Sequence, residues 1–214
     1  MARREMLRGP LPGRPPDATV VGMGRLVVQE IVTADGFAAD ADGNFTFTQK
    51  VEGSVAEWDR HQFAWLDDVD AMVMGARTYE LFNAFWPTPA SATEMIADKL
   101  NALDRYVFST TLREAPWGSI GECRIESGDA IEAIRRIKRQ TPGDVVVWGS
   151  LTLARSFLAG GEVDEVRLLV MPVALGAGRG FFPEGAQVLA LRGTETLDSG
   201  LVELVYDVRR PAAG

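Results

Sequence analysis

The stretch Val145-Val-Val-Trp-Gly149-Ser150-Leu-Thr152-Leu-Ala154 decides the fold of this chain. Three valines followed by a tryptophan predict a buried strand, which leads straight into Gly149-Ser150 and an amphipathic helix. A strand that ends in glycine at a helix start places unpaired backbone N–H groups, and the positive end of the helix, where an anion can bind. The hydroxyl groups of Ser150 and Thr152 are further donors beside these amides. We therefore expect the phosphates of a nucleotide to bind here; the alternative is a capped turn that holds no ligand.

The composition is that of a globular protein with one domain and a substantial core. The 214 residues are 46% hydrophobic and 24% charged, and the formal net charge is −8. This negative charge disfavours nucleic acid and anionic membranes, so we expect neither as a partner. An anionic ligand would need basic side chains close to it.

Cysteine and histidine are scarce, and this limits the chemistry that the chain can carry out. Cys123 is the single cysteine and His61 the single histidine, so there is no internal disulfide and no Cys/His set for zinc. We expect no metal site. No apolar run approaches the roughly 20 residues of a membrane span, and the pattern of a signal peptide is missing. A reducing cytoplasm fits these features best.

Residues 1–22 differ from the rest of the chain. They contain four arginines, two acidic residues and four prolines, with almost no periodic apolar pattern. Such a composition is typical of a disordered tail or an added leader. The predicted domain therefore spans residues 23–210.

From Arg25 onward, segments with strand periodicity alternate with segments of helical periodicity. The first predicted helix begins with a capping box, Ser54-Val-Ala-Glu57. We expect strands at Arg25–Val32, Ala71–Met74, Tyr106–Ser109, 145–148 and Glu165–Val173, and helices at 54–66, Thr78–Ala84, Ala92–Ala102, 129–139 and Leu151–Ala159.

The end of the chain predicts an antiparallel hairpin. Thr194–Asp198 and Val202–Val208 are the expected strands, joined by a turn at Ser199-Gly200. Strands linked by helices and followed by an antiparallel end indicate an α/β fold. Its sheet is mixed but mostly parallel, and helices cover both faces.

Three segments, taken together, resemble the dihydrofolate reductase-like family, in particular the reductase domain of the riboflavin-biosynthesis deaminase-reductase and its stand-alone relatives. They are Met74-Gly-Ala-Arg-Thr-Tyr-Glu80, Val147-Trp-Gly-Ser-Leu-Thr-Leu153 and Val163-Asp-Glu-Val-Arg-Leu-Leu-Val-Met-Pro-Val-Ala-Leu-Gly-Ala-Gly178. The similarity runs from about Arg25 to Arg209. It implies the three-layer dihydrofolate reductase-like fold.

The resemblance also implies that NADPH binds across the strand ends, in three loops. By position, the family's first cofactor loop matches Gly75, Arg77 and Thr78, its second matches Ser109 and Thr110, and its pyrophosphate loop matches Gly149, Ser150, Leu151 and Thr152. The glycines would allow close approach of the backbone, and the hydroxyls would donate to phosphate oxygens.

Preference for NADPH over NADH depends on an arginine in the first loop. Many relatives carry arginine where this chain has Ala76. Arg77 is then the residue expected to supply charge for a 2′-phosphate, and a solvated arginine at a helix start is the alternative. Arg179, in a glycine-rich loop, is a further candidate for a phosphate contact.

Two acids are candidates for moving a proton during hydride transfer. Asp59 is expected to share a helix face with Phe63 and Leu66, which would raise the pKa of its carboxyl group. Its spacing from Gly75 also matches that of the acid which binds pterin in dihydrofolate reductases. Asp35, in the turn after the first strand, is the second candidate, with ordinary turn chemistry as the alternative. His61 is expected on the surface beside Glu57.

The resemblance implies an NADPH-dependent reductase of a small heterocyclic or carbonyl substrate. The step known in the family is reduction of 5-amino-6-(5-phosphoribosylamino)uracil in riboflavin biosynthesis. Dihydrofolate reduction is one alternative, and a nucleotide- or flavin-binding module without turnover is another. The zinc deaminase half would need His-x-Glu and Cys-x-x-Cys motifs, which this chain lacks. Relatives are often dimers, so we expect a homodimer, for which the apolar strand at Arg167–Val173 is suited.

Overall fold

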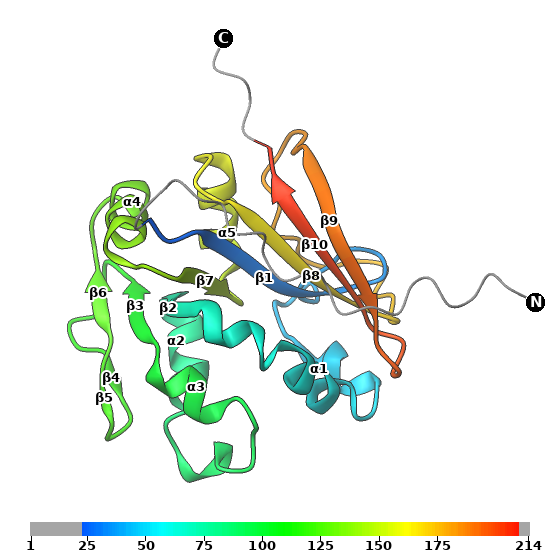
Figure 1. Ribbon diagram of the computed structural model, residues 1–214, viewed down its shortest axis with the longest axis horizontal. Helices are drawn as coiled ribbons and strands as arrows, with labels where there is room; N and C mark the ends of the chain where they lie inside the picture. Colours follow the sequence, from blue (N-terminus) through cyan, green and yellow to red (C-terminus); the bar gives the residue numbers. More distant parts are fainter. Residues whose placement is uncertain (1–22, 210–214) are drawn as a thin grey trace, which may run out of the picture.

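An eight-stranded sheet forms the centre of the molecule (Figure 1). The computed structural model describes residues 23–209, so the predicted tail at 1–22 lies outside the described residues. In spatial order the strands are β6 (Arg124–Glu126), β3 (Asp104–Phe108), β2 (Val69–Gly75), β7 (Asp144–Trp148), β1 (Leu26–Thr33), β8 (Glu165–Met171), β10 (Val202–Val208) and β9 (Leu189–Thr196).

The direction of the strands confirms the predicted mixed, mostly parallel sheet. The run from β6 to β8 is parallel throughout, and β10 pairs antiparallel with both β8 and β9. In the middle, β1 lies between β7 and β8, with Gln29 opposite Trp148. Because parallel strands point the same way, the carboxyl ends of β1, β2, β3 and β7 lie along one edge of the sheet.

Helices cover both faces of the sheet, as expected (Figure 1). The helices are α1 (Ser54–Gln62), α2 (Ala76–Asn83), α3 (Ala97–Ala102), α4 (Ala130–Gln140) and α5 (Leu151–Ala159), with short 3₁₀ turns η1 (Thr46–Lys50), η2 (Trp65–Asp68) and η3 (Pro89–Ser91). One core holds Ile134 of α4 and Phe157 of α5 against Val147. A second core, on the other face, holds Tyr79 of α2 and Leu100 of α3.

Alternation along β7 explains this division into two cores. Val145 and Val147 belong to the core under α4 and α5, whereas Val146 and Trp148 belong to the core under α2 and α3. All five residues of β7 are buried, because a central parallel strand is covered on both sides. A third, smaller core places Trp58 of α1 with Leu169 and Met171 of β8 and with Leu197 and Leu201 of the turn between β9 and β10.

The start of α1 differs from the predicted capping box. Gly53, with φ of 73°, precedes the helix, and the Ser54 hydroxyl donates backward to the carbonyl oxygen of Val51 at 2.7 Å. The Glu57 carboxylate accepts the backbone N–H groups of Asp198 and Ser199 in the distant β9–β10 turn. Both side chains that would have capped the helix are therefore used elsewhere.

Further boundaries differ from expectation. The strand expected at Thr194–Asp198 is β9, which begins earlier, at Leu189, and ends at Thr196. The helix expected at Ala92–Ala102 begins only at Ala97, because η3 and a set of turns occupy the residues before it. The helix expected over 54–66 ends at Gln62 and is followed by η2. The short strands β4 (Pro116–Trp117) and β5 (Gly121–Glu122) form a separate two-stranded hairpin that the sequence pattern does not reveal.

Candidate functional site

The strand ends of β2 and β7 are joined by a chain of three hydrogen bonds. The backbone N–H of Gly75 donates to Ser150 Oγ at 2.8 Å, and Ser150 Oγ donates to Thr78 Oγ1 at 2.9 Å. Thr78 Oγ1 in turn donates to the carbonyl oxygen of Gly149 at 3.0 Å. We call these four residues the hydroxyl link. It ties the start of α2 to the start of α5.

The hydroxyl link determines which groups near the strand ends remain for a ligand. Ser150 and Thr78 are buried and bond to each other, so in this structure their hydroxyls hold the two turns together. The first-turn N–H groups of a helix have no acceptor within the helix. The amides of Leu151 and Thr152 are such groups in α5, and Thr152 is exposed. A cradle of main-chain donors therefore lies at the positive end of α5.

Gly149 has the backbone conformation that such a cradle needs. Its φ is +58°, in the left-handed region where other residues are strained. A Cβ at this position would lie 3.5 Å from Thr78 Cγ2, so a side chain would enter the space between the two turns. The glycine keeps this space open at the edge of the sheet.

Two arginines from distant parts of the chain meet beside the same loop. Arg77 donates to the carbonyl oxygen of Gly43 at 3.3 Å, and Arg179 donates to that of Ala41 at 3.0 Å. An added Cβ on Gly43 would lie 3.0 Å from Arg179 Nη1 and 3.2 Å from Arg77 Nη1. Both arginines are exposed. They bring local positive charge to an otherwise acidic protein, as an anionic ligand requires.

The second predicted cofactor loop follows β3 and borders a cavity. Ser109 Oγ accepts the N–H groups of Thr111 and Leu112 at 3.2 and 3.1 Å, so this hydroxyl shapes the turn itself. A cavity of about 350 Å³ is lined by residues that include Ser109, Thr110 and Gly128. The loop thus offers a hollow at the carboxyl end of β3.

Asp59 is a buried acid, and its surroundings differ from the prediction that it shares an apolar helix face with Phe63. Its residue is 6% exposed, and its Oδ1 accepts a hydrogen bond from Gln62 Nε2 at 2.9 Å. Burial raises the pKa of the Asp59 carboxyl; the Gln62 bond lowers it and the charge of Glu94 raises it. Phe63, which was expected to share the Asp59 face, is 37% exposed and packs under the Lys99 ammonium.

Asp35 connects two loops. Its carboxylate accepts from Thr33 Oγ1 at 2.5 Å and from the N–H groups of Leu175 and Gly176 at 3.0 and 2.7 Å. These hydrogen bonds, that of Thr33 foremost, hold the pKa of this exposed carboxyl below its usual value. The geometry resembles the turn chemistry that was the alternative for this residue.

His61 contacts β10 and β9, and the expected pairing with Glu57 is wrong. Its Nε2 lies 2.7 Å from Glu203 Oε2, and its Nδ1 lies 3.6 Å from Glu195 Oε1. The hydrogen bond to Glu203 raises the pKa of the imidazole. His61 therefore belongs to an ion-pair group on the sheet, away from the Glu57 carboxylate.

Two polar residues of β1 were not identified from the sequence. Gln29 and Glu30 are 5% and 4% exposed, and each has a buried side-chain atom without a hydrogen-bond partner among the described residues, Gln29 Nε2 and Glu30 Oε1. Gln29 Oε1 accepts from the indole N–H of Trp148, across the β1–β7 pair. The available signal was two consecutive polar residues in the middle of an otherwise mostly apolar strand.

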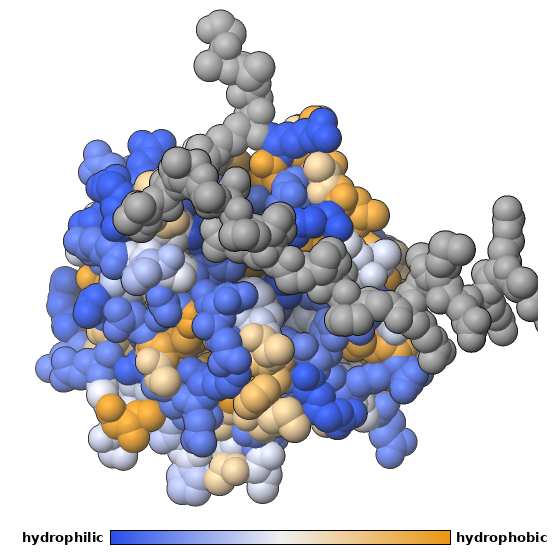
Figure 2. Space-filling view, viewed as in Figure 1, coloured by the Kyte–Doolittle hydropathy of each residue, from blue (hydrophilic) through white to orange (hydrophobic). Residues whose placement is uncertain are grey.

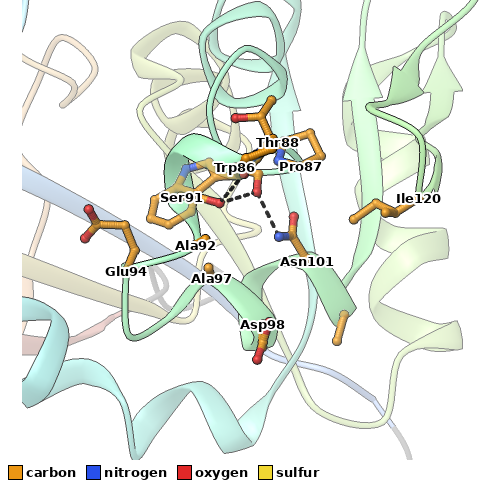
Figure 3. A pocket seen from close by; sticks show the side chains of 12 residues that line it. Trp86, Pro87, Thr88, Ser91, Ala92, Glu94, Ala97, Asp98, Asn101 and Ile120 are labelled. Atoms are coloured by element: carbon orange, nitrogen blue, oxygen red, sulfur yellow. Dashed lines mark hydrogen bonds between the residues drawn. The ribbon is translucent and has the colours of Figure 1, made fainter.

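Aromatic rings continue from Trp148 to Phe82 of α2 and then to Trp86, just beyond the end of that helix. The rings of Phe82 and Trp148 lie 6.3 Å apart, and those of Phe82 and Trp86 lie 6.2 Å apart. Trp86 borders a cavity of about 550 Å³ between η3, α3 and the β4–β5 turn (Figure 3). The main-chain oxygen of Trp86 accepts hydrogen bonds from Ser91 and Asn101, which fix one wall of the cavity.

One residue, Glu94, connects this cavity with Asp59. Glu94, whose charge contributes to raising the Asp59 pKa, also lines this cavity. Within residues 23–209, no cluster of three or more His, Cys, Asp or Glu side chains is placed to hold a metal ion. No helix there is long and apolar enough to cross a membrane.

Comparisons with known proteins agree with this architecture. The profile of the RibD C-terminal domain family matches residues 25–202. An uncharacterized protein of Bacillus subtilis (strain 168), YyaP, is 28% identical over 186 residues, which cover 85% of this chain and 94% of that protein.

Two solved structures have the same fold. One, from Shewanella sp. PV-4 and assigned to riboflavin biosynthesis, gives a TM-score of 0.65 at 21% identity over 87% of this chain and 99% of that one. The other is a dihydrofolate reductase from Enterococcus faecalis complexed with NADP(H) and RAB-propyl. It gives a TM-score of 0.53 at 13% identity over 89% and 100% of the two chains.

The fold and the joined strand ends define a dihydrofolate reductase-like α/β protein. The chain belongs to the RibD C-terminal domain family, the riboflavin-biosynthesis reductase branch of this fold. The family resemblance on which the sequence analysis relied is therefore confirmed. Family membership indicates an oxidoreductase.

Proposed function

We propose that this protein is an NADPH-dependent reductase of a small heterocyclic or carbonyl substrate, most similar in activity to 5-amino-6-(5-phosphoribosylamino)uracil reductase. The observation that carries the proposal is the hydroxyl link, which holds the first turns of α2 and α5 together at the strand ends. In a member of this family, two helix starts in that position suit a dinucleotide.

The residues present fit NADPH. Gly149 leaves a space that a Cβ would fill, and the amides of Leu151 and Thr152 supply donors for the diphosphate. Ser150 and Thr78 hold the turns, and Gly75 allows close approach. Ser109 and Thr110 would border the far part of the cofactor, beside their cavity.

Arg77 is the proposed partner of the 2′-phosphate. It binds the Gly43 carbonyl at only 3.3 Å and is exposed, so exchanging this weak bond for a charge-assisted one favours the phosphate. Arg179, which bonds to the same 41–43 loop, would add to the positive charge beside the phosphate. The preference for NADPH over NADH is predicted to depend on these two residues.

When bound, the cofactor supplies the hydride, and the protein orients the substrate and delivers a proton. Asp59 is the proposed proton donor because it is buried and its raised pKa keeps the acid form available closer to neutral pH. Asp35 is a weaker candidate, since its lowered pKa favours the ionised form and its oxygens already bind Thr33 and the 175–176 backbone.

A cofactor-oxidation assay tests the proposal. When the phosphoribosylaminouracil substrate is added, NADPH should be oxidised and its absorbance should fall. The same assay with NADH gives the comparison. Dihydrofolate is the second substrate to assay, because a buried Asp59 on α1 is the feature that favours it. If the protein binds NADPH tightly but reduces no member of a panel of carbonyl and pterin compounds, it is a nucleotide-binding module without turnover. No binding at all would contradict the proposal.

We also propose that the protein is a homodimer and, from its composition, that it works in the cytoplasm. On one face of β10, Leu204 and Tyr206 are only partly buried, opposite Leu168 and Leu191 of the neighbouring strands. Leu191 is 57% exposed, and hydrophobic surface is visible over β9 at the upper right of Figure 2. A second copy of the chain would cover these side chains.

A further inference from the structure

Glu30 is a buried acid that the proposed reaction does not use. It lies in the middle of β1, one residue beyond Gln29, whose partner Trp148 is the last residue of β7 and directly precedes Gly149. Its residue is 4% exposed. The backbone N–H of Gly149 donates to its carboxyl group, while Oε1 has no hydrogen-bond partner among the described residues.

The groups around Glu30 are apolar. On its face of the sheet, the neighbouring positions are Val28 and Val32 of β1, Val147 of β7 and Leu168 of β8, which all contribute to the same core. Two helices, α4 and α5, lie above that core. The charged side chains of α4 are either exposed or paired: Arg135 with Glu162, Arg136 with Glu126 and Lys138 with Asp164. The one charged residue of α5, Arg155, is exposed and donates to the carbonyl oxygen of Gly180. Among the described residues, none of these elements directs a charged side chain at Glu30.

The protonation state of Glu30 follows from these surroundings. Burial raises the pKa of its carboxyl to about 8, and the Gly149 N–H, which favours the ionised form, offsets only part of that effect. At neutral pH the group is therefore an uncharged acid. An uncharged acid can accept the Gly149 N–H without placing a negative charge beneath an anion site.

We propose that Glu30 is a positioning residue for the cofactor: as a neutral acid, it orients the Gly149 turn through that N–H and keeps negative charge away from the diphosphate. This inference rests on the proposed function, because it needs an anion at the Gly149 turn. Above about pH 8 the carboxyl ionises, and the resulting charge repels the diphosphate. Affinity for NADPH should then fall, and ionisation of the Glu30 side chain alone should account for the fall.

Two variants separate charge from hydrogen bonding. Glu30→Gln keeps an acceptor for Gly149 and cannot ionise, whereas Glu30→Met has similar length and no comparable acceptor. NADPH affinity is measured by calorimetry between pH 7 and 9.5, with circular dichroism to confirm folding at each pH. Glu132→Gln, on the exposed side of α4, is the matched control for loss of one carboxylate.

The wild type and Glu132→Gln should lose about tenfold in affinity as pH rises through 8. Glu30→Gln should match the wild type at pH 7 and stay constant, and Glu30→Met should bind about tenfold more weakly at every pH. A Glu30→Gln variant that follows the wild-type pH profile, or a Glu30→Met variant with full affinity, would overturn the inference.

Failure of the proposed function would give a different result. If the wild type binds no NADPH at any pH, the reductase proposal fails and the role toward the cofactor fails with it. The neutral state of Glu30 is still measured by the pH dependence of urea unfolding. Wild-type stability should fall between pH 5 and 9 relative to Glu30→Gln, because a raised folded-state pKa favours folding only while the acid is protonated.

Discussion

At the scale of single residues, Gly149 carries the most specific structural requirement. Its φ of +58° lies in the left-handed region, and its Cβ position borders Thr78. Gly149→Asp should place a charged group in the space proposed for the diphosphate. We expect a loss of roughly a hundredfold or more in NADPH affinity, about 2.7 kcal/mol, by calorimetry.

The control for this variant is Gly161→Asp. Gly161 also has a positive φ, +69°, and nothing lies within 4 Å of its added Cβ. It shares the backbone strain and the added charge but lies beyond the far end of α5. Equal losses of affinity in the two variants would show that the Gly149 turn has no special role.

Asp59 carries the prediction about proton transfer. Asp59→Asn should lower kcat by about a hundredfold or more while the Kd for NADPH changes little, because only the proton donor is removed. The wild-type rate should fall as pH rises through the raised pKa of Asp59, where the acid form is lost. An unchanged kcat would remove Asp59 from the mechanism.

Glu94 offers a second test of the same residue. Its charge helps to raise the Asp59 pKa, so Glu94→Gln should lower that pKa and move the alkaline fall of the rate to lower pH. Glu80→Gln, on the exposed side of α2, is the control and should leave the profile in place. Steady-state rates across pH measure both variants.

At the scale of elements, the sequence predicts best what is local. The β7–turn–α5 unit follows the expected boundaries because burial of the valines, the glycine turn and the helix periodicity all act within ten residues. The capping box of α1 fails because Glu57 is drawn to the 198–199 backbone, more than 140 positions away. A propensity rule contains no information about such a competing partner.

The same limit applies to the candidate site. The sequence identified Ser150 and Thr78 as phosphate donors, but it could not show that their hydroxyls bond to each other across two strands. Glu30 escaped notice because a single glutamate in a strand is normally solvent-exposed, and its burial depends on β8 and α5 covering it.

The hydroxyl link makes a prediction about stability. Thr78→Val preserves shape but leaves Ser150 Oγ without its acceptor and the Gly149 carbonyl without its donor. The variant should lose about 1–3 kcal/mol in the free energy of unfolding, measured with urea. Thr152→Val removes an exposed hydroxyl and should change stability by less than ~0.5 kcal/mol. Similar losses in both variants would contradict a structural role for the link.

At the scale of the whole molecule, the exposed apolar side chains on β9 and β10 lead to a prediction about assembly. Leu191→Arg should shift the protein from dimer to monomer in analytical ultracentrifugation, because a charge would be buried in the proposed interface. Met95→Arg alters a residue of similar exposure, 51%, in the segment before α3 and should leave the dimer intact. A wild type that sediments as a monomer would end the dimer proposal.

The joint between Gly75 and Ser150 also connects the two layers of helices, since α2 and α5 lie on opposite faces of the sheet. The amide proton of Gly75 therefore reports on this contact, because it can exchange with deuterium only when the two layers separate at this edge. If deuterium uptake at Gly75 is slow and becomes slower when a nucleotide is added, the nucleotide contacts both layers at once. This measurement needs no catalytic turnover.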